Sequence, residues 1–181
     1  MTMALSRYGR FLAALGMTIV CAASLAAQTT VILVRHAEKA AQPAADPPLT
    51  EDGKARAQAL WEAVKDANVS AIITTQLART VETAAPTAAA TRVTPQVVQA
   101  AGADHSARVA AAVKQHAGHT VLVVGHSNTV PGIIAALGAK EPAAICDPEY
   151  DGFYVVSIGV DGKASVIKSR YGAVSPACAS K

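Results

Sequence analysis

Residues 30–39, TVILVRHAEK, combine a short apolar run with reactive polar side chains. The four apolar residues at 31–34 predict a buried strand, which stops at Arg35 and His36. Open α/β sheets bind ligands just outside the carboxyl ends of such strands. The Arg35 guanidinium can donate two parallel hydrogen bonds to a phosphate, and an unprotonated His36 nitrogen can act as a nucleophile. The pair therefore suggests phosphoryl transfer, although Arg-His pairs are also common in surface loops.

The rest of the chain alternates between predicted strands and helices. Apolar runs predict strands over residues 71–74, 96–99 and 120–124, and a hairpin of residues 153–159 and 164–169. Periodic apolar positions predict helices over residues 50–68, 79–90, 104–117 and from about 130 to 137. We expect Thr50 to cap the first of these helices and Pro86 to kink the second. The alternation predicts an α/β fold.

Three more side chains with potential chemistry stand at the boundaries of these elements. Arg79 lies at the start of the second predicted helix, where free N–H groups and the helix dipole favour an anion. The strand at 120–124 ends in Gly125 and His126, so a second imidazole follows a strand. Asp104 begins the third predicted helix and is most simply its N-cap. A binding site built from these residues would combine several cations.

The first 27 residues predict a signal peptide rather than part of the domain. Arg7 and Arg10 precede an apolar run at residues 11–20, and the small residues AASLAA follow at 22–27. The alternative is a membrane anchor, but the apolar run is at the short limit for a span. We therefore expect a periplasmic or secreted protein.

The remaining residues, 28–181, predict a single domain of small aliphatic composition. Arg7 and Arg10 are two of the 16 Lys and Arg residues, so about 14 remain against 13 Asp and Glu residues. This near-neutral balance gives no sign of nucleic acid or of a membrane surface as a partner. We expect a monomer that acts on a small phosphorylated substrate.

The cysteines point to the same compartment. Of the three in the sequence, Cys21 leaves with the predicted leader, and Cys146 and Cys178 remain. An even pair in an oxidising compartment predicts a disulfide, here tying the C-terminal tail to the domain. Two unpaired thiols are the alternative.

The polar residues, taken in order, resemble the histidine phosphatase superfamily, also called the phosphoglycerate-mutase-like family. The resemblance rests on Arg35-His36-Ala37-Glu38 after the first strand, Arg79 at a helix start, and Gly125-His126 after a later strand. It covers about residues 30–138. The family fold that it implies has three layers, with a mostly parallel central sheet flanked by helices.

The resemblance also implies roles for individual residues. His36 would be the nucleophile that becomes phosphorylated, and Arg35, Arg79 and a protonated His126 would hold the phosphate. Thr50 and Gly53, in the sequence LTEDG, match a pattern that commonly follows the nucleophile, where their role is structural. Two guanidinium groups and an imidazolium could stabilise the transferred phosphoryl group without a metal or another cofactor. The expected enzyme is a metal-independent phosphatase.

The proton donor is where the sequence departs from the family. Mutase-like members supply a Glu from an insertion after the second Arg, and no matching Glu occurs between residues 91 and 103. The phytase-like branch has an Asp after the second His, where this chain has Ser127. Asp104 is the first candidate acid, followed by Glu38 and Glu82. Since no large covering domain is present, the cleft should be open, which favours hydrolysis over mutase action.

Two other classes of function fit parts of the sequence. Residues 124–129, VGHSNT, partly match the G-x-S-x-G elbow of serine esterases, with Ser127 as nucleophile. However, Thr129 replaces the last glycine, and no His follows His126. A non-catalytic phospholigand-binding module would use the same cations without turnover, and His36 is what argues against it.

Overall fold

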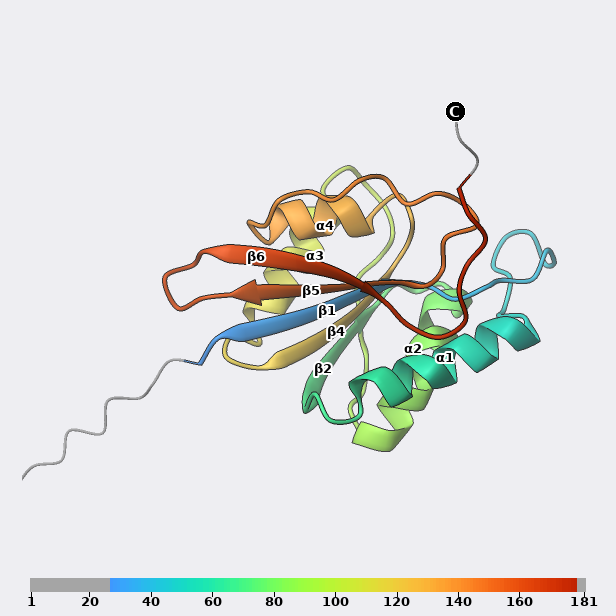
Figure 1. The fold of residues 1–181 in the computed structure, drawn as a ribbon, viewed down its shortest axis with the longest axis horizontal. Coiled ribbons are helices and arrows are strands. Elements are labelled where there is room, and N and C mark those ends of the chain that lie inside the picture. Colours follow the sequence, from blue (N-terminus) through green and yellow to red (C-terminus); the bar gives the residue numbers. More distant parts are fainter. Residues whose placement is uncertain (1–26, 179–181) are drawn as a thin grey trace, which may run out of the picture.

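The computed structural model describes residues 27–178, so the predicted signal peptide lies outside the described residues except for Ala27. One sheet of six strands runs through the molecule, in the order β3-β2-β4-β1-β5-β6 (Figure 1). The strands are β1 Thr29–Arg35, β2 Val69–Thr74, β3 Gln96–Val97, β4 Thr120–Gly125, β5 Gly152–Ile158 and β6 Ala164–Arg170. Each predicted strand is present.

The sheet is mixed. Strand β1 pairs with β4 in parallel, β4 with β2, and β2 with β3. The C-terminal hairpin adds β5 and β6 through antiparallel pairing to β1 and to each other. The parallel half carries the ends at which the sequence places its reactive residues, and the hairpin extends the other half.

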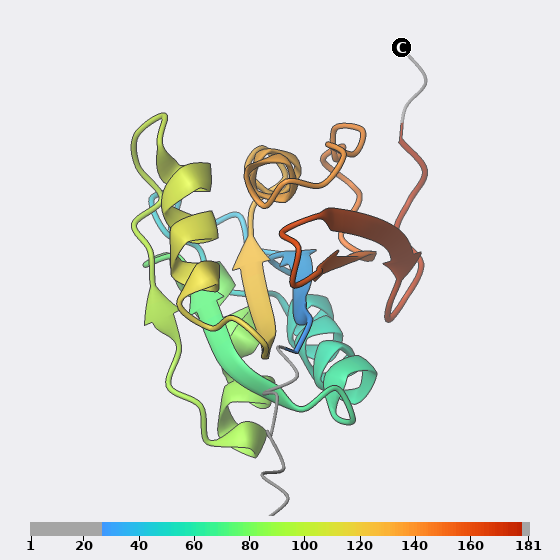
Figure 2. The ribbon, with the colours of Figure 1, turned by 90° about the vertical axis from the view of Figure 1, so that its left-hand side faces the viewer.

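Helices cover both faces of the sheet and complete three layers (Figures 1 and 2). The helices are α1 Glu51–Val64, α2 Ala78–Thr91, α3 His105–Lys114 and α4 Val130–Ala136. Because side chains alternate along a strand, β1 contributes to both cores. Val31 and Leu33 pack in the core with α3 and α4, and Ile32 and Val34 pack in the core with α1 and α2. The predicted α/β class with flanking helices is confirmed.

The register of the parallel strands brings two predicted site residues together. Arg35 lies opposite Gly125, so β1 and β4 end side by side. The next residues along the chain are His36 and His126, and the backbone N–H of His36 donates to the Gly125 carbonyl at 2.9 Å. Two histidines 90 positions apart in the sequence are therefore neighbours at one sheet edge.

The start of α1 explains the pattern LTEDG. The Thr50 hydroxyl accepts a hydrogen bond from the Gly53 N–H at 3.1 Å, as expected for an N-cap. A Cβ on Gly53 would lie 2.2 Å from the Glu38 carbonyl oxygen, so only glycine allows this close approach. The contact fixes the segment after β1 against α1, which ends at Val64, earlier than predicted.

The C-terminal tail folds back over the end of the domain. The predicted disulfide is present between Cys146 and Cys178, whose Cα atoms are 6.0 Å apart. It ties the tail to the loop that precedes β5. Among residues 27–178, no helix is both long enough and apolar enough to cross a membrane.

Candidate active site

A cleft of about 320 Å³ lies at the carboxyl edge of the parallel strands. It is lined by Arg35, His36, Lys39, Leu77, Arg79, Ala100, His126, Ser127, Asn128, Thr129 and Asp147. The four residues predicted to take and hold a phosphate are therefore in one cleft, whereas Asp104 is not among its lining residues. A larger cavity, of about 620 Å³, lies near the amino end of β1, but its lining is mainly apolar and includes none of these groups.

His36 is held in an orientation that suits a nucleophile. Its Nδ1 lies 2.8 Å from the Ala37 carbonyl oxygen, a contact that requires the ring proton to be on Nδ1. The lone pair is then on Nε2. The backbone around the ring is also fixed, because the Ala37 N–H donates to the Thr83 hydroxyl on α2 at 2.9 Å. A backbone carbonyl therefore sets the tautomer of the ring.

The environment of His36 keeps its ring neutral. Burial lowers the pKa of His36 to about 3, against the opposing effect of the hydrogen bond to Ala37, and the charges of His126, Arg35 and Arg79 lower it further. The residue is only 4% exposed. Protonation would put a charge into a site that is already cationic and poorly solvated. The neutral ring, which is the form that a nucleophile would need, therefore prevails at neutral pH.

His126 is the second imidazole of the cleft, and the ring centroids of the two histidines are 5.3 Å apart. Its Nε2 lies 3.2 Å from the Thr75 hydroxyl. Burial lowers the pKa of His126 to about 4, and Arg79, His105 and Arg35 contribute in the same direction. The sequence interpretation assumed an imidazolium here, but the free cleft favours neutral His126. The two negative charges of a phosphate would oppose that shift.

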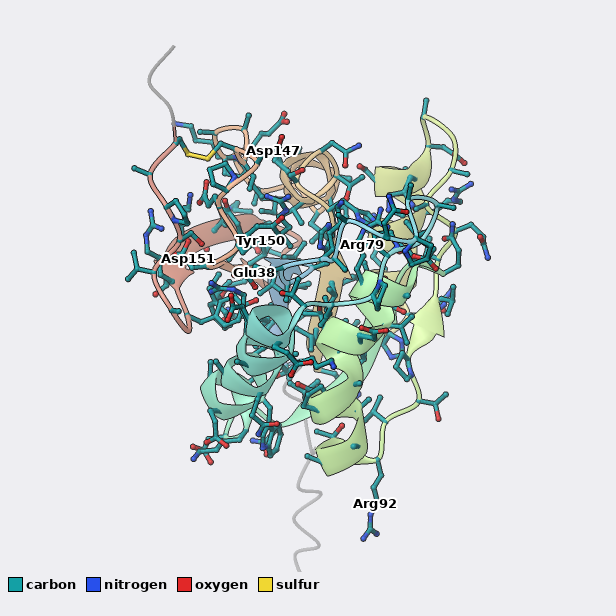
Figure 3. The ribbon with its side chains drawn as sticks, turned by 90° about the vertical axis from the view of Figure 1, so that its right-hand side faces the viewer. Glu38, Arg79, Arg92, Asp147, Tyr150 and Asp151 are labelled. Carbon is teal, nitrogen blue, oxygen red and sulfur yellow. A yellow bond between two sulfur atoms is a disulfide. The ribbon has the colours of Figure 1, made fainter. Side chains whose placement is uncertain are left out.

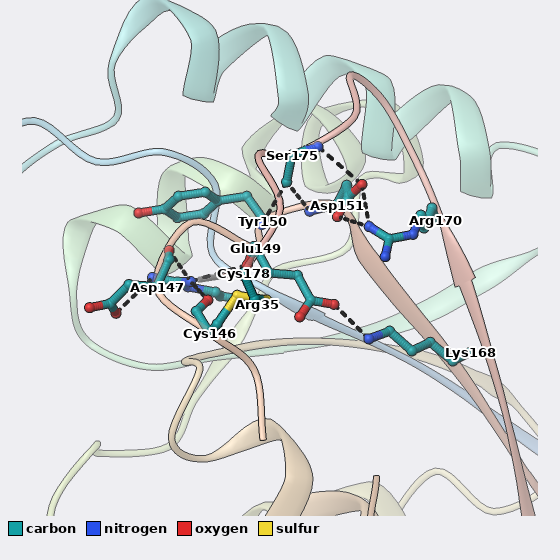
Figure 4. Close-up of a disulfide and its surroundings, with 10 residues drawn as sticks. All are labelled: Arg35, Cys146, Asp147, Glu149, Tyr150, Asp151, Lys168, Arg170, Ser175 and Cys178. Atoms are coloured by element: carbon teal, nitrogen blue, oxygen red, sulfur yellow. Dashed lines mark hydrogen bonds and ion pairs between the residues drawn. A yellow bond between two sulfur atoms is a disulfide. The ribbon is translucent and has the colours of Figure 1, made fainter. Parts of the chain in front are cut away.

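Arg35 is held by backbone carbonyls from a distant loop. One terminal nitrogen, Nη1, donates to the carbonyls of Cys146 at 3.0 Å, Asp147 at 2.7 Å and Glu149 at 3.1 Å (Figure 4). The guanidinium carbon also lies 4.1 Å from the centre of the Tyr150 ring. The charge is thus fixed in the cleft wall before any ligand arrives.

Arg79 belongs to the first turn of α2. Its guanidinium lies 3.7 Å from the carboxylate of Asp46, in the loop between β1 and α1. The same carboxylate accepts hydrogen bonds from the Ala78 N–H at 2.9 and 3.1 Å. Asp46 therefore satisfies a free N–H group at the start of α2 and anchors the loop beside Arg79. No local sequence pattern predicts this contact, because it joins residues 32 positions apart.

Known proteins share these features of the chain. A family model described as histidine phosphatase superfamily (branch 1) matches residues 31–101, which include Arg35, His36 and Arg79. The proposed phosphohistidine phosphatase SixA of Nakamurella multipartitia is 28% identical, with a TM-score of 0.60 over 82% of this chain and 99% of that chain. The resemblance to the histidine phosphatase superfamily that the sequence predicts is therefore supported by both comparisons.

More distant solved structures share the fold of this chain. One is a protein histidine phosphatase SixA in complex with tungstate, 16% identical, with a TM-score of 0.61 over 78% of this chain and 96% of that chain. Another is a mycobacterial glucosyl-3-phosphoglycerate phosphatase, also 16% identical, with a TM-score of 0.61 over 81% of this chain and 99% of that chain. No curated protein sequence matches the chain. The family-model match and the 28% identical neighbour support an enzyme with a phosphatase- or mutase-like function.

The three acids predicted as candidate proton donors are engaged in other contacts in the structure. Asp104 precedes α3 and pairs with Arg108 at 3.2 Å. The Glu38 carboxylate is bound by Arg56 at 2.7 Å. Glu82 accepts a hydrogen bond from the backbone of the loop before α1. The assignment of Asp104 as general acid stays a prediction, with no support from the lining of the cleft.

Asp147 is a cleft residue that the sequence did not single out. It is the one carboxylate among the lining residues, and it lies 4.0 Å from the Arg35 guanidinium with its side chain fully exposed. Figure 3 shows Asp147, Tyr150 and Arg79 at the same end of the molecule. The loop CDPEY carries no motif for a proton donor, so only the folded chain reveals this position.

The described residues give little support to a serine nucleophile or to a metal site. Ser127 lines the cleft, but no hydrogen bond joins its hydroxyl to a histidine within residues 27–178, as an activated serine would need. One group of three potential metal ligands occurs in that range, formed by Cys146, Glu149 and Cys178. Its two sulfurs are bonded to each other, so they are not available as thiolate ligands.

Proposed function

We propose that this protein is a phosphatase that hydrolyses a phosphomonoester through a phosphohistidine at His36. The observation that carries the proposal is the neutral His36 ring, whose Nδ1 is held by a backbone carbonyl while Nε2 shares the cleft with Arg35, Arg79 and His126. A nucleophile with a fixed tautomer beside several cationic groups suits phosphoryl transfer, which depends on positioning and charge stabilisation.

The reaction has two steps. In the first, Nε2 of His36 attacks phosphorus, a P–N bond forms, and the ester P–O bond breaks with its electron pair on the leaving oxygen, which takes up a proton. In the second, the oxygen of a water molecule attacks phosphorus and the P–N bond breaks, which returns the electron pair to Nε2 and releases inorganic phosphate. The proton that the water loses passes to the group that protonated the leaving oxygen. Arg35 and Arg79 stabilise the non-bridging oxygens throughout. His126 can take up a proton as the dianionic phosphate binds.

The covalent step can be tested directly. Rapid quenching with a labelled aryl phosphate should trap an acid-labile, base-stable phosphoryl group on His36. The variant His36→Ala should lose nearly all turnover and still bind inorganic phosphate, because Arg35, Arg79 and His126 remain. Wild-type turnover in His36→Ala would reject the nucleophile. Phosphate binding by the wild type without turnover on any phosphomonoester would favour the binding-module alternative.

We also propose that the protein works as a monomer outside the cytoplasm on a small phosphorylated substrate. The disulfide between Cys146 and Cys178 is consistent with an oxidising compartment. Mass spectrometry of the exported protein should find an amino terminus near Ala27 or Gln28. A full-length chain recovered from the cytoplasm would contradict this localisation.

A further inference from the structure

The segment that holds Arg35 has no regular secondary structure of its own. It lies between α4 and β5, and residues 139–151 form neither helix nor strand. Its carbonyls at Cys146, Asp147 and Glu149 accept hydrogen bonds from one nitrogen of Arg35. A loop of this kind must be fixed by tertiary contacts if it is to hold a charged side chain in one position.

Those contacts come from the C-terminal tail and from β6 (Figure 4). The disulfide joins Cys146 in the loop to Cys178 in the tail. The Ser175 hydroxyl in the tail accepts hydrogen bonds from the N–H groups of Tyr150 at 2.9 Å and Asp151 at 3.0 Å. From β6, the Lys168 ammonium pairs with Glu149 at 2.6 Å. The covalent link is made at a residue whose carbonyl also binds Arg35.

We propose that the Cys146–Cys178 disulfide is a positioning element of the phosphate site, which acts by holding the loop that orients Arg35. The inference rests on the proposed function, because it assumes that Arg35 binds the phosphate. It adds a structural reason for the tail: the last described residues complete the site from outside the parallel sheet. Cys178 is exposed, so a reductant in solution can reach the bond.

The expected effect follows from preorganisation. With the bond intact, the Arg35 guanidinium is already aimed, and phosphate binding does not have to order it. With the bond broken, the tail and loop gain freedom, and part of the binding free energy is spent on ordering them again. We expect the Kd for inorganic phosphate to rise about tenfold, and kcat/KM to fall by a similar factor. The hydrogen bond that orients His36 is accepted by the Ala37 carbonyl, which is outside the loop, so the covalent intermediate should still form.

The experiment compares inorganic phosphate binding by calorimetry in the oxidised wild type, the reduced wild type and the double variant C146S/C178S, well below their Tm. The reduced wild type and the double variant should both bind about tenfold more weakly, and reductant should not change the double variant further. In the Arg35→Ala variant, binding should be weak and independent of the disulfide. If breaking the disulfide still weakens phosphate binding in Arg35→Ala, the proposal that the bond acts through Arg35 is wrong.

A stability control separates positioning from general loosening. Val64→Ala removes buried volume from the end of α1, in the core on the other side of the sheet from α4. It should lower Tm and leave the Kd for phosphate unchanged. If breaking the disulfide lowers Tm and also leaves Kd unchanged, the bond is only a structural staple and the inference is wrong.

A second variant covers the case in which the reduced protein does not fold. Ser175→Ala keeps the disulfide and removes the hydroxyl that holds Tyr150 and Asp151, so it should weaken phosphate binding severalfold. An unchanged Kd in a folded Ser175→Ala protein would overturn the inference. If the wild type hydrolyses phosphomonoesters but the Kd for phosphate changes neither on breaking the disulfide nor in Ser175→Ala, the inference is wrong and the proposed function still stands. A wild type that neither binds nor hydrolyses them rejects the proposed function as well.

Discussion

The environment of His36 decides whether it can serve as a nucleophile at neutral pH. Its ring is buried among cationic groups, and both conditions disfavour the imidazolium form. A surface histidine would be partly protonated in the same solution. The Ala37 carbonyl adds a second requirement by setting the tautomer. These contacts favour a reactive nitrogen without a neighbouring carboxylate to activate it.

This environment predicts an unusual pH profile. The pKa of His36 is lowered to about 3 and that of His126 to about 4, so the proposed nucleophile His36 stays unprotonated as the pH falls from 7 to 5. On an aryl phosphate, whose leaving group scarcely needs a proton, kcat/KM corrected for ionisation of the substrate should therefore stay level over this range and fall only near pH 3–4. Because the rings of His36 and His126 interact, the apparent pKa of this decrease at low pH belongs to the two histidines together. An acid limb centred near pH 6.5 would contradict the lowered pKa of His36.

The identity of the proton donor is a second prediction at the residue scale. Asp147 lines the cleft, whereas Asp104 pairs with Arg108 away from it. If Asp147 donates the proton, Asp147→Asn should reduce kcat about 10²-fold on an alkyl phosphate and only slightly on an aryl phosphate, whose leaving group scarcely needs a proton. Asp104→Asn is the matched control. The reverse result, with the loss in Asp104→Asn, would restore the acid predicted from the sequence.

At the scale of the elements, the loop between β1 and α1 contributes Lys39 to the lining of the cleft. Its ends are joined by a bridge between Lys39 and Leu49. From its middle, Asp46 reaches the first turn of α2 and lies beside Arg79. A carboxylate at this place competes with a phosphate for the same cation and helix terminus.

The substitution Asp46→Asn separates the hydrogen bond that Asp46 accepts from α2 from the negative charge that it places beside Arg79. The amide oxygen can still accept a hydrogen bond from Ala78, but the negative charge beside Arg79 is lost. We expect the Kd for inorganic phosphate to fall about two- to fivefold, since exposed charge pairs contribute roughly 0.2–1 kcal/mol. The gain should shrink at high salt. Weaker binding by the variant would instead mean that the Asp46 carboxylate is needed to position Arg79.

The sequence predicted the elements well because their signals are local. The apolar run that ends at Arg35 and His36 predicts both strand β1 and the end of it that faces the cleft. Thr50 likewise predicts the start of α1. No local pattern predicts the hydrogen bonds of Arg35, because the carbonyl groups that accept them lie 111 to 114 positions away in the sequence. Asp147 could not be found for the same reason, since its loop reaches the cleft through contacts with residues that are distant in the sequence.

At the scale of the whole molecule, the two buried histidines tie stability to pH. In the unfolded chain each histidine titrates near its ordinary value of about 6.5. In the folded protein the pKa values of His36 and His126 are lowered to about 3 and 4. Between about pH 4 and 6.5 the unfolded chain therefore binds more protons than the folded chain. The free energy of unfolding must rise with pH over this window and lose this dependence above it.

Denaturant unfolding between pH 5 and 7.5 measures this dependence while acidic side chains of ordinary pKa stay ionised. The free energy of unfolding should fall as the pH drops, by up to about 1.4 kcal/mol per pH unit for each additional proton bound by the unfolded chain. His36→Asn and His126→Asn should each flatten the slope, because each removes one titrating group. His119→Asn, an exposed position between α3 and β4, should leave the slope unchanged. An equally steep slope in all three variants would show that the two buried rings titrate alike in the folded and unfolded chain, and the neutral nucleophile would then need another explanation.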